Sequence, residues 1–301
     1  MASLQSYIFR VLTKTISHRL HAISSISKLR SFSENISRLL PMPLGVATRT
    51  VLLNGIPVEW IEPRSAASSS VIIYLHGGAW VLGWYQNHRV LTARIGQATG
   101  SRMLAVDYRL SPEHPFPAAL DDCLAVYQGL LQGGFLPEQI VLAGDSAGAN
   151  LALAAMISLR DSGKPLPVAA VCISPVSDLT ENSDAFSNKR DALLSSEFAY
   201  VMSRHYIQRI NPEQPLISPR YGDLAGLPPL LIQIGKEEIL LDDARGLHER
   251  AVKAGLDVSF TIWPGMWHVW HLYAPFLPEA RLAIAEIGSF VRRYMSTADR
   301  H

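Results

Sequence analysis

The chain has 301 residues, 48% hydrophobic and 18% charged, a balance that excludes a disordered protein and is typical of a globular enzyme. Its net charge of +1 gives no reason to expect a nucleic-acid partner. Two isolated cysteines, Cys123 and Cys172, indicate neither a disulfide framework nor a structural zinc site, so we expect a cytoplasmic protein.

The N-terminal segment is basic and contains no Asp or Glu before Glu34. Apolar residues between Ile8 and Ile26 recur at spacings of one, three or four, which predicts two amphipathic helices packed on the rest of the protein. A targeting or membrane-surface segment has the same composition and stays open as the alternative. No run of 18 apolar residues occurs, so we expect no membrane partner, although the basic segment leaves lipid contact open.

Strand and helix patterns then alternate along the chain. Residues 48–63 predict a hairpin that turns at Asn54-Gly55, because both residues tolerate positive φ. Further strands are expected at 71–78, 103–110, 168–175, 229–235 and 257–265, with helices at 118–131, 240–254 and 279–295. This order predicts an α/β fold with a mostly parallel central sheet and helices on both faces. Residues 180–220 break the alternation and predict an insertion over the sheet edge.

Residues 139–160 predict a strand, a sharp turn and an alanine-rich helix, and the turn reads Gly144-Asp145-Ser146-Ala147-Gly148. This is the G-x-S-x-G pattern, in which the serine sits on a tight strand-to-helix turn with its hydroxyl exposed at the sheet edge. A chance glycine-rich turn is the competing interpretation. The strand before it and the helix after it favour Ser146 as a nucleophile.

A second glycine-rich turn follows the strand at 71–78 and reads His76-Gly77-Gly78-Ala79. Small residues there allow backbone N–H groups to approach a ligand closely, as in the oxyanion hole of many lipases and esterases. We therefore predict oxyanion donors from Gly77, Gly78 and Ala79, together with the N–H of Ala147. A merely structural turn is the alternative for this segment taken alone.

A serine nucleophile needs a base, and His268 follows the last predicted strand, after Pro264-Gly265. A loop at that position lies at the same sheet edge as the nucleophile, since the carboxyl ends of parallel strands meet there. His271 is the rival, and we predict a packed or exposed structural histidine at that position instead.

Taken together, these motifs resemble the hormone-sensitive-lipase-like family of α/β-hydrolases, the microbial carboxylesterases in particular. The resemblance rests on HGGAWVLG at 76–83, DYRLSPEHPFPAALDD at 107–122, GDSAGAN at 144–150 and PGMWHVW at 264–270. It implies an ester hydrolase for relatively short acyl chains, with neither metal nor organic cofactor. It also implies a helical cap from residues 1–45 and 180–217, over a catalytic domain of residues 46–179 and 218–301.

The same resemblance assigns Asp107, Arg109, Glu113 and Pro115 to a structural turn rather than to catalysis. Many members carry a third glycine where this chain has Ala79. The amide of Ala79 can still serve the oxyanion if its φ is negative, because only glycine adopts positive φ without cost.

Four carboxylates crowd the segment IGKEEILLDDA at 234–244. The family register places Glu238 where members commonly have the aspartate that orients the histidine. Asp242 and Asp243 lie where a helix begins, a position that favours acids, and Glu237 is expected to be solvated. Asp178, after the strand at 168–175, is the outside competitor.

We therefore expect a carboxylic ester hydrolase for short- to medium-chain acyl esters, with a triad of Ser146, His268 and Glu238 and a covalent acyl-enzyme. Its partner would be a small-molecule ester, and a homodimer is left open. Lactones, amides or formamides are alternative substrates for the same triad. A catalytically silent small-molecule-binding protein is the alternative outside enzymology. Five aromatic residues are candidates either for the pocket wall or for cap packing: Trp84, Tyr85, Phe198, Tyr206 and Trp267.

Overall fold

The computed structural model describes residues 2–180 and 191–298, which form an eight-stranded sheet with helices on both faces. The strand order is β1-β2-β4-β3-β5-β6-β7-β8. The pairs from β4 through β3 to β8 are parallel, and β1 and β2 join the β4 edge in antiparallel fashion. The strands are β1 (Val46–Leu53), β2 (Ile56–Pro63), β3 (Ala67–Leu75), β4 (Ser101–Val106), β5 (Ile140–Asp145), β6 (Ala169–Ile173), β7 (Leu230–Gly235) and β8 (Val258–Trp263).

The hairpin of β1 and β2 follows from its turn residues. Leu53 pairs with Ile56, and the two residues between them, Asn54 and Gly55, have φ values of 49° and 82°. Positive φ at both positions matches the turn whose twist suits a two-residue hairpin loop. The expectation of a hairpin at this place is confirmed.

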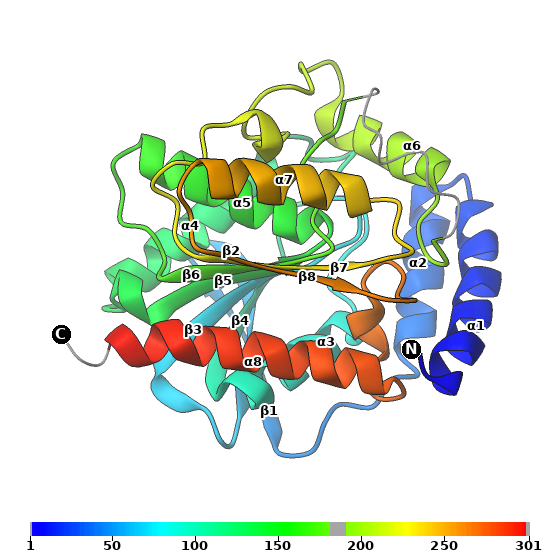
Figure 1. Ribbon diagram of the computed structural model, residues 1–301, viewed down its shortest axis with the longest axis horizontal. Coiled ribbons are helices and arrows are strands. Elements are labelled where there is room, and N and C mark those ends of the chain that lie inside the picture. Colours follow the sequence, from blue (N-terminus) through cyan, green and yellow to red (C-terminus); the bar gives the residue numbers. More distant parts are fainter. Residues whose placement is uncertain (1, 181–190, 299–301) are drawn as a thin grey trace.

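Alternation along the inner strands divides the core into two halves. Val71, Ile73 and Leu75 of β3 pack on one face, and Ile72 and Tyr74 pack on the other. Figure 1 shows the first face covered by α4 (Ala118–Gln132), α5 (Ala147–Asp161) and α7 (Leu241–Lys253), and the second by α3 (Gln86–Thr99) and α8 (Pro278–Ala298). Helix α3 is not among the elements that the sequence patterns above predict. It ends at Gly100 with φ of 72°, a common helix stop.

Three more helices lie at the end of the molecule opposite the C-terminus (Figure 1). They are α1 (Leu4–His21), α2 (Ile26–Ser37) and α6 (Ser196–Ile207), and short 3₁₀ helices occur at η1 (Pro137–Gln139), η3 (Pro219–Tyr221) and η4 (Trp270–Tyr273). The polar start of the predicted insertion, residues 181–190, lies outside the described residues. Among the helices of the described chain, none is both long and apolar enough to cross a membrane.

Candidate active site

Ser146 occupies a strained turn between β5 and α5. Its φ is 53° and its ψ is −118°, and its N–H donates to the carbonyl of Ile173 at 2.8 Å. A Cβ on Gly148 would lie 1.9 Å from the carbonyl oxygen of Leu75, and one on Gly144 would lie 2.5 Å from the backbone of Gly148. Both flanking positions must therefore be glycine, which is the physical content of the G-x-S-x-G pattern.

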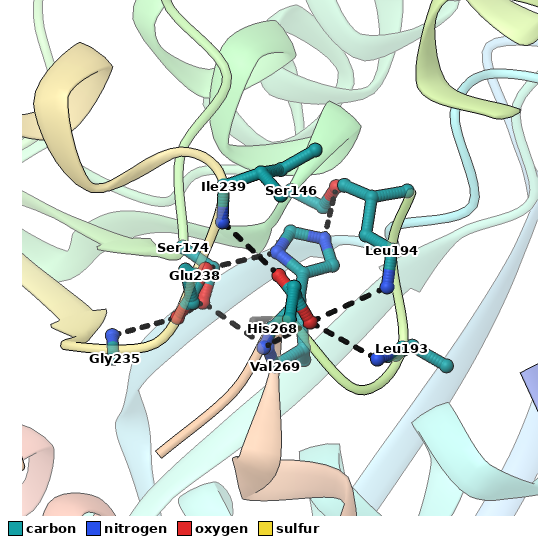
Figure 2. A network of polar contacts seen from close by, with 10 residues as sticks. Ser146, Ser174, Leu193, Leu194, Gly235, Glu238, Ile239, His268 and Val269 are labelled. Atoms are coloured by element: carbon teal, nitrogen blue, oxygen red, sulfur yellow. Dashed lines mark hydrogen bonds and ion pairs between the residues drawn. The ribbon is translucent and has the colours of Figure 1, made fainter. Parts of the chain in front are cut away.

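His268 and Glu238 complete a chain of hydrogen bonds from the serine hydroxyl. The Nε2 atom of His268 lies 2.9 Å from Ser146 Oγ, and its Nδ1 atom lies 2.9 Å from Glu238 Oε2 (Figure 2). All three side chains are nearly enclosed by protein, because each residue is at most 7% exposed. The structure thus brings together the nucleophile, base and acid predicted from three separate strand ends.

Burial and the charge of the partner residue shift the pKa values of His268 and Glu238 in opposite directions. Burial alone would lower the pKa of His268, but the hydrogen bond and charge of Glu238, with the charges of Asp191 and Asp145, raise it. Burial raises the pKa of Glu238 despite its bond to His268. The site therefore favours the imidazolium that forms when His268 accepts a proton.

The second carboxylate oxygen of Glu238 is fixed by two donors. Oε1 accepts from Ser174 Oγ and from the N–H of Gly235, both at 2.7 Å. The N–H of Val269, next to the base, donates to the same serine hydroxyl at 3.2 Å. Ser174 therefore connects the acid with the loop that carries the base, although no motif singled it out.

The rival acids have other partners. Asp242 is exposed and pairs with Arg245 at 2.9 Å, as suits a helix start. Asp243 also lies in the first turn of α7, but it is buried and accepts the N–H of Ser177 at 2.7 Å. The helix-start explanation is incomplete for Asp243. Burial raises its pKa to about 6.

Glu237 is not solvated as expected, since its side chain is 15% exposed and lies 3.5 Å from Arg10 of α1. Asp178 accepts from Thr180 at 2.7 Å and from Tyr221 at 3.2 Å rather than from His268. His271 is buried, and its Nε2 lies 2.9 Å from Gln233 Oε1, so it is a packed histidine. Burial lowers the pKa of His271 to about 3.

The turn after β3 corrects one predicted oxyanion donor. The N–H of Gly77 donates to the buried Asp145 carboxylate at 3.0 Å, which leaves it unable to serve the oxyanion at the same time. Across residues 2–180 and 191–298, no hydrogen bond uses the N–H of Gly78, Ala79 or Ala147. These three groups remain the candidate donors.

Ala79 takes a φ of 54°, so a negative φ is not the condition that decides its role. Its N–H makes no hydrogen bond within residues 2–180 and 191–298 and therefore stays available to an oxyanion. Ala79 stands between Gly78 at 115° and Trp80 at 60°, so three consecutive residues have positive φ. A non-glycine residue in this region costs about 1–2 kcal/mol. The turn therefore stores strain at the point where a substrate oxygen would bind.

Asp191 is a functional candidate that the sequence patterns missed. Its Oδ1 accepts the N–H of His268 at 3.2 Å and those of Leu193 and Leu194 at 3.0 and 3.3 Å, while Oδ2 accepts the N–H of Ile239 at 3.3 Å. Figure 2 labels the donor residues Leu193, Leu194 and Ile239, which lie beside the triad. Because Asp191 sits in the insertion and follows no strand, the strand-end rule could not find it.

Asp191, Glu238 and His268 also form a cluster of metal-ligating types, with one atom from each within 4.8 Å of the others. Both nitrogens of His268 are hydrogen-bonded, to Ser146 and Glu238. Both oxygens of Asp191 accept backbone N–H groups. These atoms are thus already engaged within the protein, and the arrangement fits a hydrogen-bonded charge network better than a metal site.

A cavity of about 470 Å³ opens above Ser146 and His268. Its wall is mainly apolar and includes Phe9, Ile16 and Leu20 of α1, with Leu193, Leu194 and Phe198 from the segment before and within α6. The segments expected to form a cap thus contribute to the wall of the cavity. A cleft of this size and polarity suits a small organic ligand.

Of the five aromatic candidates, Tyr85 and Phe198 line the cavity. Trp84 instead donates its Nε1–H to Glu59 at 2.6 Å. Tyr206 stacks on Trp80 with ring centres 4.3 Å apart, and Trp267 lies in the core against Tyr273.

Comparison with known proteins finds hydrolases and esterases that this chain resembles. Residues 72–272 match the protein family described as alpha/beta hydrolase fold. The chain is 49% identical over 252 residues to an acetyl-hydrolase of Streptomyces hygroscopicus, covering 83% of this chain and 84% of that protein. It is 40% identical over 265 residues to an esterase of Acinetobacter venetianus, covering 87% of each.

A crystal structure of an esterase from the bacterial hormone-sensitive lipase family superposes with a TM-score of 0.92 at 40% identity, covering 98% of this chain and 100% of that one. The fold is therefore that of an α/β-hydrolase, as predicted. Within that class, the chain belongs to the hormone-sensitive-lipase-like family of esterases.

Proposed function

We propose that this carboxylesterase cleaves its esters with Ser146 as nucleophile, His268 as base and Glu238 as the acid that orients the base. The observation that carries the assignment is the continuous hydrogen-bonded line from Ser146 Oγ through both nitrogens of His268 to Glu238. A serine hydroxyl is a weak nucleophile unless an adjacent base takes its proton and a third group holds that base in place.

In the first step, Ser146 Oγ bonds to the ester carbonyl carbon while His268 Nε2 takes the hydroxyl proton. The carbonyl oxygen becomes an oxyanion, which the N–H groups of Gly78, Ala79 and Ala147 can stabilise. One such donor is typically worth about 2.7–4 kcal/mol. The C–O bond to the alcohol then breaks, and the alcohol oxygen leaves with the proton from His268, which gives an acyl-enzyme.

In the second step, His268 takes a proton from water as the water oxygen bonds to the acyl carbon. The bond to Ser146 breaks, Oγ regains its proton, and the carboxylic acid leaves. Glu238 keeps its charge throughout, and its bond to Nδ1 holds the histidine tautomer that both steps need.

The size and apolar wall of the cavity support a preference for esters with uncharged acyl groups of short to medium length. Its wall is built largely from aliphatic and aromatic side chains, and its volume is about 470 Å³. Turnover of 4-nitrophenyl esters of increasing acyl length should rise and then fall as the chain outgrows this cavity. A rate independent of acyl length would contradict an acyl pocket here.

The nucleophile is tested with Ser146→Ala. This variant should lose about a millionfold in kcat on 4-nitrophenyl butyrate, the scale seen when a catalytic serine is removed. It should also lose covalent labelling by a fluorophosphonate. Wild-type turnover by the variant would refute the assignment, and absence of labelling in the wild-type protein would favour a silent binding protein. Matched ester and amide pairs then measure the preference between these substrates.

The acid is tested by a pair of neighbouring substitutions. Glu238→Gln should lower kcat by orders of magnitude, because an amide at this position can stabilise the wrong histidine tautomer. Glu237→Gln removes the ion pair with Arg10 and should leave kcat within a few-fold of the wild-type value. The reverse ranking would assign the acid to Glu237.

We also propose a cytoplasmic location, supported by Cys123 and Cys172, which are both unpaired and buried. Fractionation of cells that express the natural protein, without added signals, tests this. Recovery with secreted proteins would contradict it.

A further inference from the structure

Helix α1 has an inverted distribution of polar and apolar side chains. Its buried residues are Ser6, Thr13 and Ser17, all hydroxyl-bearing. Five apolar residues are instead between 50% and 74% exposed: Leu4, Tyr7, Ile8, Val11 and Leu12. At 100° per residue these five fall on one side of the helix, opposite the three hydroxyls. We refer to them as the outer apolar face.

This orientation is fixed by specific bonds. Thr13 Oγ1 donates to Tyr273 Oη at 2.8 Å, and Ser17 Oγ donates to the carbonyl of Ala192 at 2.8 Å. Just before the helix, the N–H of Ser3 donates to Glu279 at 2.6 Å. Rotation of α1 to bury the outer apolar face would break these bonds, so the face is held toward solvent. Figure 1 shows α1 (dark blue) on the outside of the molecule.

The same side of α1 becomes cationic toward its C-terminal end. Lys14 and Arg19 are exposed, as is His18, and the chain has no acidic residue before Glu34. This side of α1 therefore combines the two attractions that hold a surface helix on an anionic bilayer, namely apolar area that enters the lipid and cations that face its head groups. Each lysine or arginine near an anionic membrane adds attraction, which salt weakens.

We propose that the outer apolar face, with Lys14 and Arg19, docks the protein onto an anionic lipid bilayer. A second copy of the chain fits this surface less well. Two α1 helices in contact would bring together cations for which neither helix supplies an acidic partner. A bilayer offers both hydrocarbon for the aliphatic side chains and phosphates for the cations.

Docking in this way would place the cavity beside the membrane. Phe9, Ile16 and Leu20 of α1 line the cavity, so one helix would contact both the lipid and the acyl pocket. Esters dissolved in the bilayer would then be the substrate source. This last step rests on the proposed function, whereas binding itself does not require turnover.

The test is sedimentation of the full chain with vesicles, either of phosphatidylcholine alone or of equal parts phosphatidylcholine and phosphatidylglycerol. The wild-type protein should bind the mixed vesicles more tightly and lose binding as salt rises. Val11→Gln with Leu12→Gln should weaken binding about tenfold or more, because two half-exposed apolar side chains no longer enter the lipid. Lys14→Gln with Arg19→Gln should weaken it about fivefold per cation removed at low salt.

The matched control is Val252→Gln with Leu282→Gln, since these residues are 52% and 61% exposed on α7 and α8. This pair should leave vesicle binding at the wild-type level. Equal binding by all variants, or none by the wild-type protein, would overturn the proposal. A concentration-dependent dimer that the Val11/Leu12 pair abolishes would assign the face to a second copy instead. Loss of vesicle binding with unchanged hydrolysis of a soluble ester would separate docking from catalysis.

Discussion

At the scale of single residues, Asp191 connects three segments of the chain through hydrogen bonds. Its carboxylate joins the segment before α6 to the backbone of His268 and to Ile239, the residue after Glu238. Burial raises the pKa of Asp191, and its charge raises the pKa of both His268 and Glu238. We therefore treat it as a positioning residue that acts through the base.

Asp191→Asn should shift the activity profile toward acid. The amide keeps one oxygen for the N–H donors but removes a negative charge near the imidazole, so the pKa of His268 falls. Because His268 must be neutral to act as base, the acidic limb of kcat/KM should move to lower pH, with a loss of about tenfold in kcat. Steady-state kinetics across pH measure the position of the acidic limb and kcat. Glu238 and Asp145 are the other charges that raise the pKa of His268, and they remain in this variant.

Asp243→Asn provides the comparison, since Asp243 is also a buried carboxylate that accepts backbone N–H groups, from Ser177 and Asp178. It should lower the free energy of unfolding without moving the acidic limb. If both variants lose stability and neither moves that limb, Asp191 has only a structural role.

Backbone strain at Ala79 should have a measurable effect on the free energy of unfolding. Its φ of 54° costs about 1–2 kcal/mol, whereas glycine adopts this conformation freely but loses about 0.5–1 kcal/mol more entropy on folding. Ala79→Gly should therefore raise the free energy of unfolding by about 0.5–1 kcal/mol, as measured by urea denaturation. Ala285→Gly, at an exposed position of α8, should instead lower it by about 1 kcal/mol. A loss of stability in both would contradict strain at Ala79.

At the scale of elements, sequence patterns predicted the helices, strands and turns whose formation depends on residues close together in the chain. The Asn54-Gly55 turn, the continuous apolar strands and the alanine-rich α5 carry strong signals, and the nucleophile follows from two of them. Helix α3 was missed because its residues 86–99 mix polar and apolar positions around Gly96, which packs against Met103 and Pro63. Asp191 and Ser174 were missed because their roles depend on which segments meet in space.

Helix α2 is anchored by one arginine beside the oxyanion turn. Arg30 donates to the carbonyls of Val81 and Ser111, both at 2.8 Å, and to both carboxylate oxygens of Glu113. Arg30→Gln should lower the free energy of unfolding by about 1–2 kcal/mol, because two part-buried carbonyls lose a charged donor. It should also raise KM, since α2 and the following residues line the cavity.

Glu113→Gln tests which of these bonds matters, because Glu113 is half exposed and its removal leaves both carbonyl bonds intact. It should cost less than about 1 kcal/mol in unfolding experiments. Equal losses in the two variants would mean that the ion pair, and not the carbonyls, anchors α2.

At the scale of the whole molecule, the parallel sheet gathers distant parts of the chain at one edge. Ser146 follows β5, Glu238 follows β7 and His268 follows β8, so the triad forms only when the strands from β5 through β6 to β8 are in register. A partly buried polar network joins β7 to α8. His271 meets Gln233 of β7, which donates to Glu286 of α8 at 2.7 Å. Strand β7 therefore contributes both to the geometry of the triad and to the stability of the fold.

His271 makes that stability depend on pH. Burial lowers its pKa from 6.5 to about 3, so in the folded protein it stays neutral while in the unfolded chain it gains a proton below pH 6.5. Its contribution is fully present above pH 6.5 and is lost as pH falls toward 3. Between pH 7 and pH 5 this loss is about 2 kcal/mol. In His271→Gln, the drop in the free energy of unfolding over that interval should be smaller by about this amount, by urea denaturation at each pH. The control is His114→Gln, at an exposed histidine, in which the free energy of unfolding should depend on pH as in the wild-type protein. The same dependence in all three proteins would show that His271 already takes up its proton in the folded state.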